Sequence, residues 1–365
     1  MRKVSAPPSA PRRGAGVEES AGVLRACGLV ALVSATTSCF HVDYVMQAAE
    51  GQLDLACRAR SIEDARQDPD IEPRVRALLG EVAHIKAFAK REGLVPTDSY
   101  EDFVALDRGS VVYVVTAAPP LSLEPLRWDF PIVGSVPYLG WFDEQRARHE
   151  AAKLKKKGWD VHVRGASAYS TLGWFDDAVL SSMIDDGDEA IGELADTIIH
   201  ESVHATIYVP DQSEFNESLA AFVAEKLTPL WLTERYGAGS VELEAYLESE
   251  RYADAVRARF EAAYAHLKAL YASKRSKAEK LAEKERYLEN LSSELSLGSA
   301  LNNARLAGYD AYHGGDAAFA EMLARCGTVR ELMKAVATAE PSDFPGEQAD
   351  DVLPTVRKLA ARCKK

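Results

Sequence analysis

Two histidines and a glutamate stand together near the middle of the chain, in the stretch His200-Glu201-Ser202-Val203-His204. Residues four positions apart project from the same face of a helix, so His200 and His204 can bind one metal ion. Glu201 then lies beside that face, where it can act as general base toward a water molecule at the ion. The alternative is a helix that carries two histidines by chance. Because this arrangement is typical of catalytic zinc sites, it predicts Zn²⁺ as the cofactor.

The sequence around the motif predicts that it lies on a buried helix. Apolar residues recur through it at helical spacing, and they are Ile191, Leu194, Ala195, Ile198, Ile199, Val203 and Ile207. Residues 210–213 (Pro-Asp-Gln-Ser) are expected to break this helix. A second helix is predicted from Glu214 to about Tyr236, with Asp211 or Ser213 as its cap. Pro229 is expected to kink that helix or to end it early.

A catalytic zinc ion needs three protein ligands and one open position. Glu217, one turn into the second helix, is the predicted third ligand. Glu214, Asp211 and Glu225 are alternative ligands, and Glu217 could instead be a solvated first-turn acid favoured by the helix dipole. Asn216 and Glu225 are predicted to orient the ligands rather than to bind the ion. Small residues of the second helix would let the two helices approach closely, and they are Ser218, Ala220, Ala221 and Ala224.

The order of these motifs resembles known metallopeptidases. H-E-x-x-H followed by a helix that reads N-E-x-x-A, at Asn216 to Ala220, resembles the gluzincins, although the interval between His204 and Glu217 is shorter than in thermolysin. A longer set of segments is similar to a bacterial family of predicted aminopeptidases, which are zinc-dependent lipoproteins. These segments are Gly51-Gln52-Leu53, Phe130 to Gly134 with Pro137-Tyr138, Tyr169 to Asp177, His200 to His204, Phe215 to Ser218, and Asn302 to Leu306. The resemblance covers roughly residues 39 to 335 and implies aminopeptidase activity on a peptide substrate.

Peptide hydrolysis at a metal also needs a hydrogen-bond donor for the oxyanion of the tetrahedral intermediate. The resemblance to gluzincins implies a tyrosine or histidine from outside the metal-binding helices. The candidates are Tyr208, Tyr309, Tyr312 and His313, of which Tyr208 lies one turn after His204. For each of them the alternative is a packing aromatic or a surface histidine.

A strand predicted at Ala168 to Trp174 is a candidate for substrate binding. By analogy with zincins, it would pair as an edge strand with an extended peptide, through Tyr169, Thr171 and Gly173. The alternative is a core strand that leads to a turn at Asp176-Asp177.

The composition is that of an ordinary globular protein, with 47% hydrophobic and 27% charged residues in a chain of 365. The formal net charge is −13. A chain this acidic is not expected to present a dominant basic face, which argues against nucleic acid as a partner.

The N-terminus is predicted to be an export signal. Arg12, Arg13 and Arg25 supply positive charge, and residues 26–35 form an apolar stretch that is too short to span a bilayer. Residues 36–39 (Thr-Thr-Ser-Cys) resemble a bacterial lipobox, with threonine where leucine is usual. The interpretation is a signal peptide over residues 1–38 and a lipidated Cys39 that anchors the protein to the membrane of the cell envelope, facing the periplasm. An uncleaved apolar segment is the alternative.

The remaining cysteines indicate at most one disulfide. If Cys27 is removed and Cys39 is lipidated, then Cys57, Cys326 and Cys363 remain. One pair among them could form in an oxidising compartment, and the sequence does not say which.

The predicted fold class is α+β and mostly helical, a zincin-like metallopeptidase with a small mixed sheet and a long helical hairpin. Residues 39–240 would form the catalytic region, 241–340 the hairpin and C-terminal helices that complete the same domain, and 341–365 a tail. The elements expected from periodicity are listed here: helices over 40–95 and 144–157, strands over 111–116, 130–136 and 160–163, a hairpin over 241–297 that turns near 273–276, and a helical region over 302–337.

The function predicted from these observations is a zinc metallopeptidase, and the resemblance makes it an aminopeptidase. An endopeptidase of the cell envelope with the same chemistry is one alternative. A non-catalytic envelope scaffold that binds zinc structurally is another, although a structural site would not need Glu201 between its ligands.

Overall fold

The computed structural model describes residues 39–130, 134–168, 176–307, 315–346 and 351–363. The chain divides into two compact units, Met1–Asp54 and Leu55–Lys365. The predicted signal peptide lies outside the described residues. Helix α2 (Cys39–Arg58) begins in the first unit and ends in the second. Among the described residues, no helix combines the length and the apolar character that crossing a bilayer requires.

The second unit begins with short helices, as the sequence predicts for this region. Its first elements are β1 (Arg60–Ser61), α3 (Ile62–Gln67), α4 (Pro73–Leu79) and α5 (Val82–Arg91). Ser61 caps α3 because its hydroxyl accepts a hydrogen bond from the Asp64 N–H at 3.0 Å. In α5 the buried residues Val82, Ile85, Phe88 and Ala89 recur at helical spacing, so this helix packs one face on the core.

The strands form separate small sheets. A mixed sheet has the order β1–β2–β8, in which β2 (Asp102–Val104) is antiparallel to β1 and parallel to β8 (Val179–Leu180). An antiparallel sheet has β3 (Val112–Ala118) between β6 (Leu139–Trp141) and β7 (Asp160–Ala166). Its register pairs Val115 of β3 with Leu139 and with Val163. The strands predicted over 111–116 and 160–163 are therefore confirmed.

One strand prediction was wrong. In place of a single strand over 130–136, β4 (Trp128–Phe130) pairs antiparallel with β5 (Gly134–Val136). The apolar residues of this segment match the pattern of a buried strand, but such a pattern does not show where one strand ends and the next begins. The strand predicted over residues 168–174 falls almost entirely outside the described residues.

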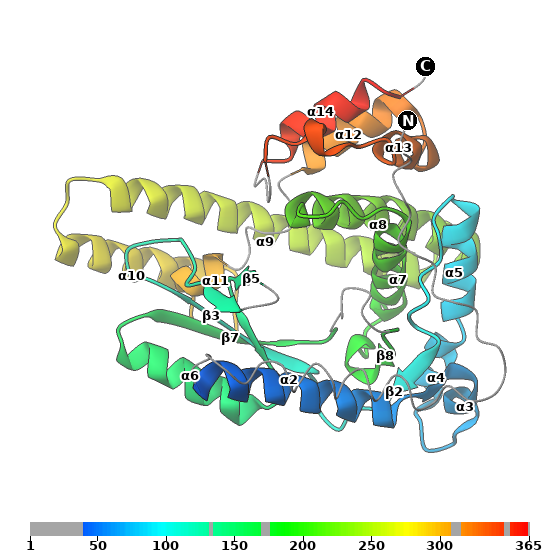
Figure 1. Ribbon diagram of the computed structural model, residues 1–365, viewed down its shortest axis with the longest axis horizontal. Coiled ribbons are helices and arrows are strands. Elements are labelled where there is room, and N and C mark those ends of the chain that lie inside the picture. Colours follow the sequence, from blue (N-terminus) through cyan, green and yellow to red (C-terminus); the bar gives the residue numbers. More distant parts are fainter. Residues whose placement is uncertain (1–38, 131–133, 169–175, 308–314, 347–350, 364–365) are drawn as a thin grey trace. The chain divides into compact units, whose positions relative to one another are not determined.

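Helix α6 (Glu144–Lys156) confirms the helix predicted before β7. It is capped by Asp143, whose carboxylate accepts a hydrogen bond from the Arg146 N–H at 2.8 Å. Its buried face packs against β3 and β7, and Figure 1 shows it running along the antiparallel sheet.

Two consecutive helices form the centre of the second unit. After β8, the short helix η1 (Ser181–Met183) leads to α7 (Ala190–Thr206), and α8 (Ser213–Tyr236) follows. A short turn joins them, and they pack against each other where they cross in Figure 1. The small residues Ser218, Ala220 and Ala224 of α8 are fully buried, as expected for helices in close contact.

Details of α8 differ from the predictions. Its N-cap is Gln212, which makes no side-chain cap, whereas Asp211 lies in a left-handed turn (φ 60°) and Ser213 is already helical. The helix also continues past Pro229 instead of ending early. Thr228 and Trp231 are buried on either side of the proline, and this packing holds the helix together where the proline cannot donate a hydrogen bond.

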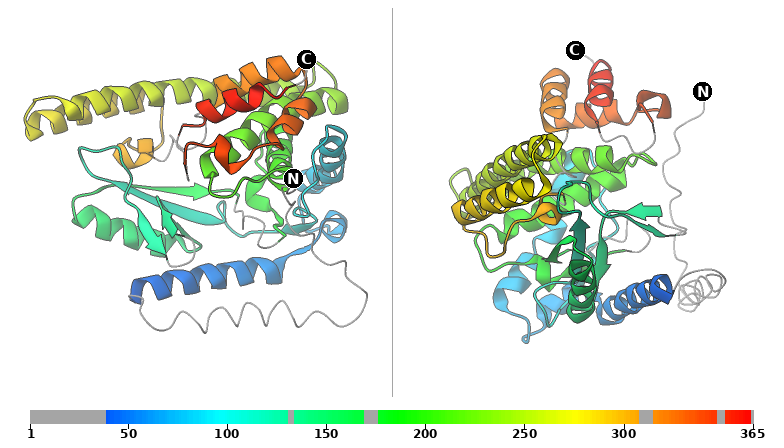
Figure 2. Two further views of the ribbon diagram at one scale, coloured as in Figure 1. Left: turned by 45° about the horizontal axis from the view of Figure 1, so that its top comes forward. Right: turned by 90° about the vertical axis from the view of Figure 1, so that its left-hand side faces the viewer.

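The predicted helical hairpin is confirmed. Helix α9 (Val241–Ala272) and helix α10 (Lys277–Glu294) lie side by side in Figures 1 and 2. The turn falls at residues 273–276, where Ser276 and Glu279 form a capping box at the start of α10. Leu267, Leu288 and Leu291 fill the space between the two helices.

The C-terminal region is helical and is cross-linked by a disulfide. It contains α11 (Asn303–Ala307), α12 (Asp316–Cys326), α13 (Val329–Val336), η2 (Pro341–Asp343) and α14 (Leu353–Ala360). The segment expected to be a tail thus includes α14, which buries Val356 and Leu359 against α12. Cys326 is bonded to Cys363, and Cys57 is an exposed free thiol.

Candidate metal centre

The last turns of α7 and the first turns of α8 bring His200, His204 and Glu217 together. The Nε2 atoms of the two histidines lie 3.1 Å apart. The Glu217 carboxylate faces both rings, with Oε2 at 3.4 Å from His200 Nε2 and Oε1 at 3.5 Å from His204 Nε2. All three side chains are largely buried, at 21%, 16% and 28% exposure. Among the described residues, these three form the group whose ligand atoms converge closely enough to hold a metal ion.

The spacing of these atoms fits a zinc ion. Bonds of roughly 2.0–2.1 Å that meet at tetrahedral angles place ligand atoms about 3.3 Å apart. The observed separations of 3.1, 3.4 and 3.5 Å bracket that value. Two imidazoles and one carboxylate are also the ligand set of catalytic zinc sites, which keep a fourth position open.

The charges of the three residues are arranged to attract a cation. Burial opposes ionisation of Glu217, but its interactions with His200 and His204 outweigh this effect and lower its pKa to about 2. Glu217 is therefore ionised at neutral pH. Within the described part of the chain, the buried Nδ1 atom of His204 has no hydrogen-bond partner.

Asn216 fixes the turn between the two helices. Its Oδ1 atom accepts a hydrogen bond from the Val209 N–H at 2.9 Å, and its Nδ2 atom donates to the Val209 carbonyl at 2.8 Å. Because Asn216 is buried and precedes Glu217 directly, this two-point contact sets the position of Glu217 relative to the end of α7. The contact supports the prediction that Asn216 orients the ligands.

The alternative ligands lie apart from this group. Asp211 is exposed in the turn, and Glu214 is 3.5 Å from the Ser218 hydroxyl of its own helix. Glu225, which was predicted to orient a histidine, forms an ion pair with Lys226 at 2.6 Å. No contact of Glu225 with either histidine is observed among the described residues.

Asp196 is a further carboxylate that acts on His200, and the sequence analysis did not identify it. It lies one turn before His200 on α7, and its charge acts on that imidazole. Tyr246 of α9 donates a hydrogen bond to Asp196 Oδ1 at 2.9 Å. Gly192 makes this possible, because a Cβ atom there would lie 2.5 Å from the Tyr246 ring. The D-x-x-x-H spacing was a usable signal, since it places both side chains on one helix face.

Glu201 lies beside the ligands in a partly buried position, as predicted. Burial raises the pKa of its carboxyl group, and the charges of Glu217 and Asp177 act in the same direction, while His204 and His200 oppose them. A carboxylate with a raised pKa is suited to accept a proton near neutral pH.

Two tyrosines lie near the candidate ligands. Tyr208 follows α7, with its ring centroid 6.5 Å from that of His204, and its side chain is half exposed. Tyr138, between β5 and β6, was not considered as a donor, although Pro137-Tyr138 belongs to the resemblance. The pKa of Tyr138 is raised by partial burial and by the charge of Glu217, while Arg164 acts to lower it. The other predicted donors and the substrate-binding residues lie outside the described residues: Tyr309, Tyr312, His313, Tyr169, Thr171 and Gly173.

A family model with the description "Putative aminopeptidase" matches residues 43–343, which include all three candidate ligands and Glu201. A comparison with curated proteins found no match, and neither did a comparison with solved structures.

Proposed function

Because the chain belongs to the family described as "Putative aminopeptidase", we propose that it is a zinc-dependent aminopeptidase. The observation that supports zinc is the convergence of His200, His204 and Glu217 within 4.8 Å of one another, with Glu201 beside them. The donor set and its spacing are those of catalytic rather than structural zinc sites.

In the proposed mechanism His200, His204 and Glu217 hold the ion. When bound, zinc supplies a Lewis acid that polarises the scissile carbonyl and makes water nucleophilic at neutral pH. Glu201 takes the proton of the attacking water and later delivers it to the leaving amine. Asp196 acts on His200 through its charge, and Asn216 fixes the start of α8 that carries Glu217. Tyr138 and Tyr208 are the described candidates for the hydroxyl that stabilises the oxyanion.

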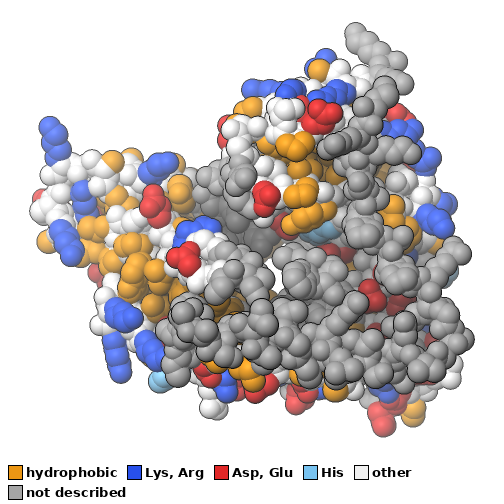
Figure 3. Space-filling view, in the orientation of Figure 1, with side chains coloured by type: hydrophobic (Ala, Val, Ile, Leu, Met, Phe, Trp, Pro, Cys, Tyr) orange, Lys and Arg blue, Asp and Glu red, His pale blue; other side chains and the backbone are white. Residues whose placement is uncertain are grey.

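We further propose that the protein is an envelope lipoprotein attached through Cys39. The Cys326–Cys363 disulfide supports export, because disulfides persist in oxidising compartments such as the periplasm. On the face shown in Figure 3, positive and negative side chains are intermixed, which supports a peptide rather than a nucleic acid as the partner.

Glu201→Gln tests the proposed reaction. Glutamine keeps the size and polarity of the side chain but cannot accept a proton, so zinc content and the circular dichroism spectrum should not change. Hydrolysis of peptides with a free N-terminus should fall about 10²–10⁴-fold, the usual contribution of a positioned acid–base group. Glu225→Gln is a matched control on α8 and should leave turnover within about twofold.

A comparison of peptide substrates with free and with blocked N-termini separates this proposal from its alternatives. Free and N-terminally blocked versions of the same peptides are compared with the zinc-loaded protein. Hydrolysis of blocked peptides in their interior would indicate an endopeptidase. A wild-type protein that binds one zinc ion and cleaves no peptide would indicate a non-catalytic scaffold that binds zinc structurally.

A further inference from the structure

The first turn of α8, which carries Glu217, is held by residues from the far end of the chain. Gln212 is the N-cap of α8, and its carbonyl accepts a hydrogen bond from the Asn216 N–H at 3.0 Å. The Gln212 side chain does not cap its own helix, and its Nε2 atom donates to the Gly346 carbonyl at 2.7 Å. Gly346 belongs to residues 343–346, which we call the clamp. Because Gln212 is only 6% exposed, loss of this hydrogen bond would leave a buried polar group unpaired.

Aromatic contacts hold the same turn of α8. The Phe215 ring is fully buried and meets the ring of Phe344, in the clamp, edge to face, with 5.2 Å between the ring centroids. Phe319 of α12 lies 5.8 Å from Phe215 and stacks on Phe222, two turns further along α8, at 5.6 Å. Figure 1 shows α12 and α14 lying over α8. Because ring pairs of this kind favour particular relative orientations, these contacts oppose rotation of α8 about its own axis.

The clamp is itself attached to the C-terminal helices. The Asp343 carboxylate forms ion pairs with Lys358 of α14 at 2.8 Å and with Arg362, just after α14, at 2.6 Å. The next residue, Cys363, is bonded to Cys326 at the end of α12. The contacts therefore close a ring that runs from the start of α8 through the clamp, α14 and α12 and back to α8.

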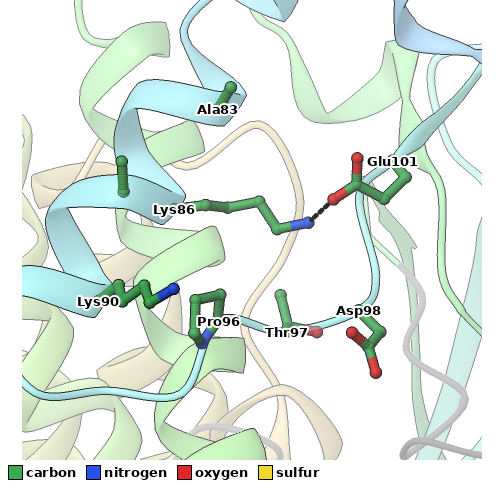
Figure 4. Close-up of a pocket in the computed structure, with 8 residues that line it drawn as sticks. Ala83, Lys86, Lys90, Pro96, Thr97, Asp98 and Glu101 are labelled. Atoms are coloured by element: carbon green, nitrogen blue, oxygen red, sulfur yellow. Dashed lines mark hydrogen bonds and ion pairs between the residues drawn. The ribbon is translucent and has the colours of Figure 1, made fainter.

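The helix that carries the histidines is supported by a different part of the chain. The Val95 N–H donates to the hydroxyl of Thr206, the last residue of α7, at 2.7 Å. Lys86 of α5 fixes the loop after Val95, because its ammonium group donates to the Ser99 carbonyl at 2.7 Å and reaches across a pocket to form an ion pair with Glu101 (Figure 4). Besides packing on each other, α7 and α8 thus have separate supports. The separation of the histidines from the third candidate ligand therefore depends on both.

We propose that Gln212 and Phe344 are positioning residues for Glu217. The clamp holds the first turn of α8 from the C-terminal side, while Asn216 holds it from the end of α7, and together they keep the Glu217 carboxylate at 3.4 and 3.5 Å from the two histidine nitrogens. A ligand that is held in place before the ion arrives loses little freedom on binding, so the affinity for the ion is higher. This inference rests on the proposed function for the identity of the ion, whereas the contacts of the clamp do not depend on it.

The first test measures the zinc dissociation constant of the whole chain by competition with a chromophoric chelator. Phe344→Ala and Gln212→Met should each weaken zinc binding about 10–100-fold, the usual effect of changing a residue that supports a metal ligand. Methionine keeps the length of Gln212 but cannot donate the hydrogen bond. Leu332→Ala is the matched control, because it shortens a fully buried side chain of α13, in the same C-terminal region but outside the clamp. It should lower the stability of the protein and leave the affinity for zinc near that of wild type.

The same variants loaded with Co²⁺ report the geometry of the ligands. The visible absorption of Co²⁺ depends on the number and arrangement of its ligands, so displacement of Glu217 should change the spectrum of Phe344→Ala and Gln212→Met but not that of Leu332→Ala. Wild-type zinc affinity and an unchanged Co²⁺ spectrum in the first two variants would overturn the proposal. An equal loss of affinity in Leu332→Ala would also overturn it, because the effect would then come from lower stability and not from the clamp.

The second test needs neither metal nor activity. Amide hydrogen exchange of the metal-free protein is followed by mass spectrometry in peptides that cover residues 213–219 and 228–236, at the two ends of α8. In Phe344→Ala the first peptide should exchange at least about fivefold faster than in wild type, while the second is unchanged, because only the first turn loses its support. Unchanged exchange of residues 213–219 would overturn the proposal even in an active zinc peptidase. Faster exchange there would support the clamp even if the wild-type protein bound no zinc, a result that would contradict the proposed function alone.

Discussion

The Nε2 atoms of His200 and His204 lie 3.1 Å apart on adjacent turns of α7, with both nitrogens directed at the Glu217 carboxylate. With one nitrogen protonated and the other bare, the pair forms an N–H···N hydrogen bond, whereas two protons or two bare lone pairs at this separation repel. A cation between them satisfies both nitrogens and the carboxylate at once. The two nitrogens and the carboxylate therefore converge on one point, as the ligands of the proposed metal ion would.

The assignment of Glu217 as a ligand predicts how zinc binding responds to mutation. Glu217→Ala, His200→Ala and His204→Ala should each lose stoichiometric zinc, because the two ligands that remain hold the ion poorly. Glu214→Ala should keep it, since Glu214 lies one turn earlier on α8 outside the group. Zinc per protein after dialysis is the measurement. Full occupancy in Glu217→Ala would move the third-ligand role to Glu214, Asp211 or Glu225.

The positions of the tyrosines predict which one stabilises the oxyanion. Tyr138 experiences the charge of Glu217, whereas the Tyr208 ring meets the His204 ring edge-on, with 6.5 Å between their centroids. Both side chains are about half exposed. Tyr138→Phe should therefore lower kcat about 10²–10³-fold, the usual loss for one oxyanion donor. Tyr208→Phe should change kcat much less. Steady-state kinetics on one peptide decides between them, and the reverse order would assign the role to Tyr208.

The convergence of the three candidate ligands was predictable because their geometry is local. Spacing along a helix places His200 and His204 on one face, and the turn after Pro210 is short enough that Glu217 must return past them. The spacing of apolar residues predicted α7, α8 and the hairpin of α9 and α10 for the same reason. In a helix, the face on which a residue lies follows from its position relative to its neighbours in sequence.

The surroundings of Glu201 were not predictable because they come from distant loops. Asp177, whose charge acts on Glu201, is joined to Ser99 beside the parallel pairing of β2 with β8, more than 70 residues away in sequence. Asp196 carried a spacing signal, but its partner Tyr246 belongs to α9 and reaches it only because residue 192 is glycine. The disulfide partner of Cys326 likewise depends on where α14 packs.

The lipoprotein proposal predicts a membrane-bound protein whose attachment depends on one sulfur atom. Cys39→Ser should release the protein from the membrane fraction or leave its precursor uncut, because serine cannot receive the lipid. Cys57→Ser is the matched control and should change neither. Fractionation with mass determination of the N-terminus is the measurement, and a soluble wild-type protein with an intact N-terminus would contradict the proposal.

The ion-pair cluster around Asp343 predicts how the stability of the second unit depends on pH. The buried carboxylate accepts hydrogen bonds from Lys358 at 2.8 Å, Arg362 at 2.6 Å and the Glu340 N–H at 2.8 Å. Burial opposes its ionisation, but these partners outweigh burial and lower the pKa of Asp343 to about 2. A carboxyl group whose pKa is lower in the folded state stabilises the fold above its unfolded pKa of about 3.9 and loses that contribution as pH falls through its folded pKa.

The stabilisation from Asp343 should therefore be complete at pH 5 and above and disappear between about pH 4 and pH 2. Its magnitude is on the order of 1–2 kcal/mol after allowance for screening by solvent. Asp343→Asn should unfold at lower urea concentration at pH 7, and the difference from wild type should shrink toward pH 2 as the wild-type carboxylate is protonated. Asp129→Asn, which alters an exposed carboxylate in β4, should show no such convergence. A constant difference between Asp343→Asn and wild type across this range would mean that the cluster stabilises the C-terminal helices through shape and hydrogen bonding, with no net contribution from charge.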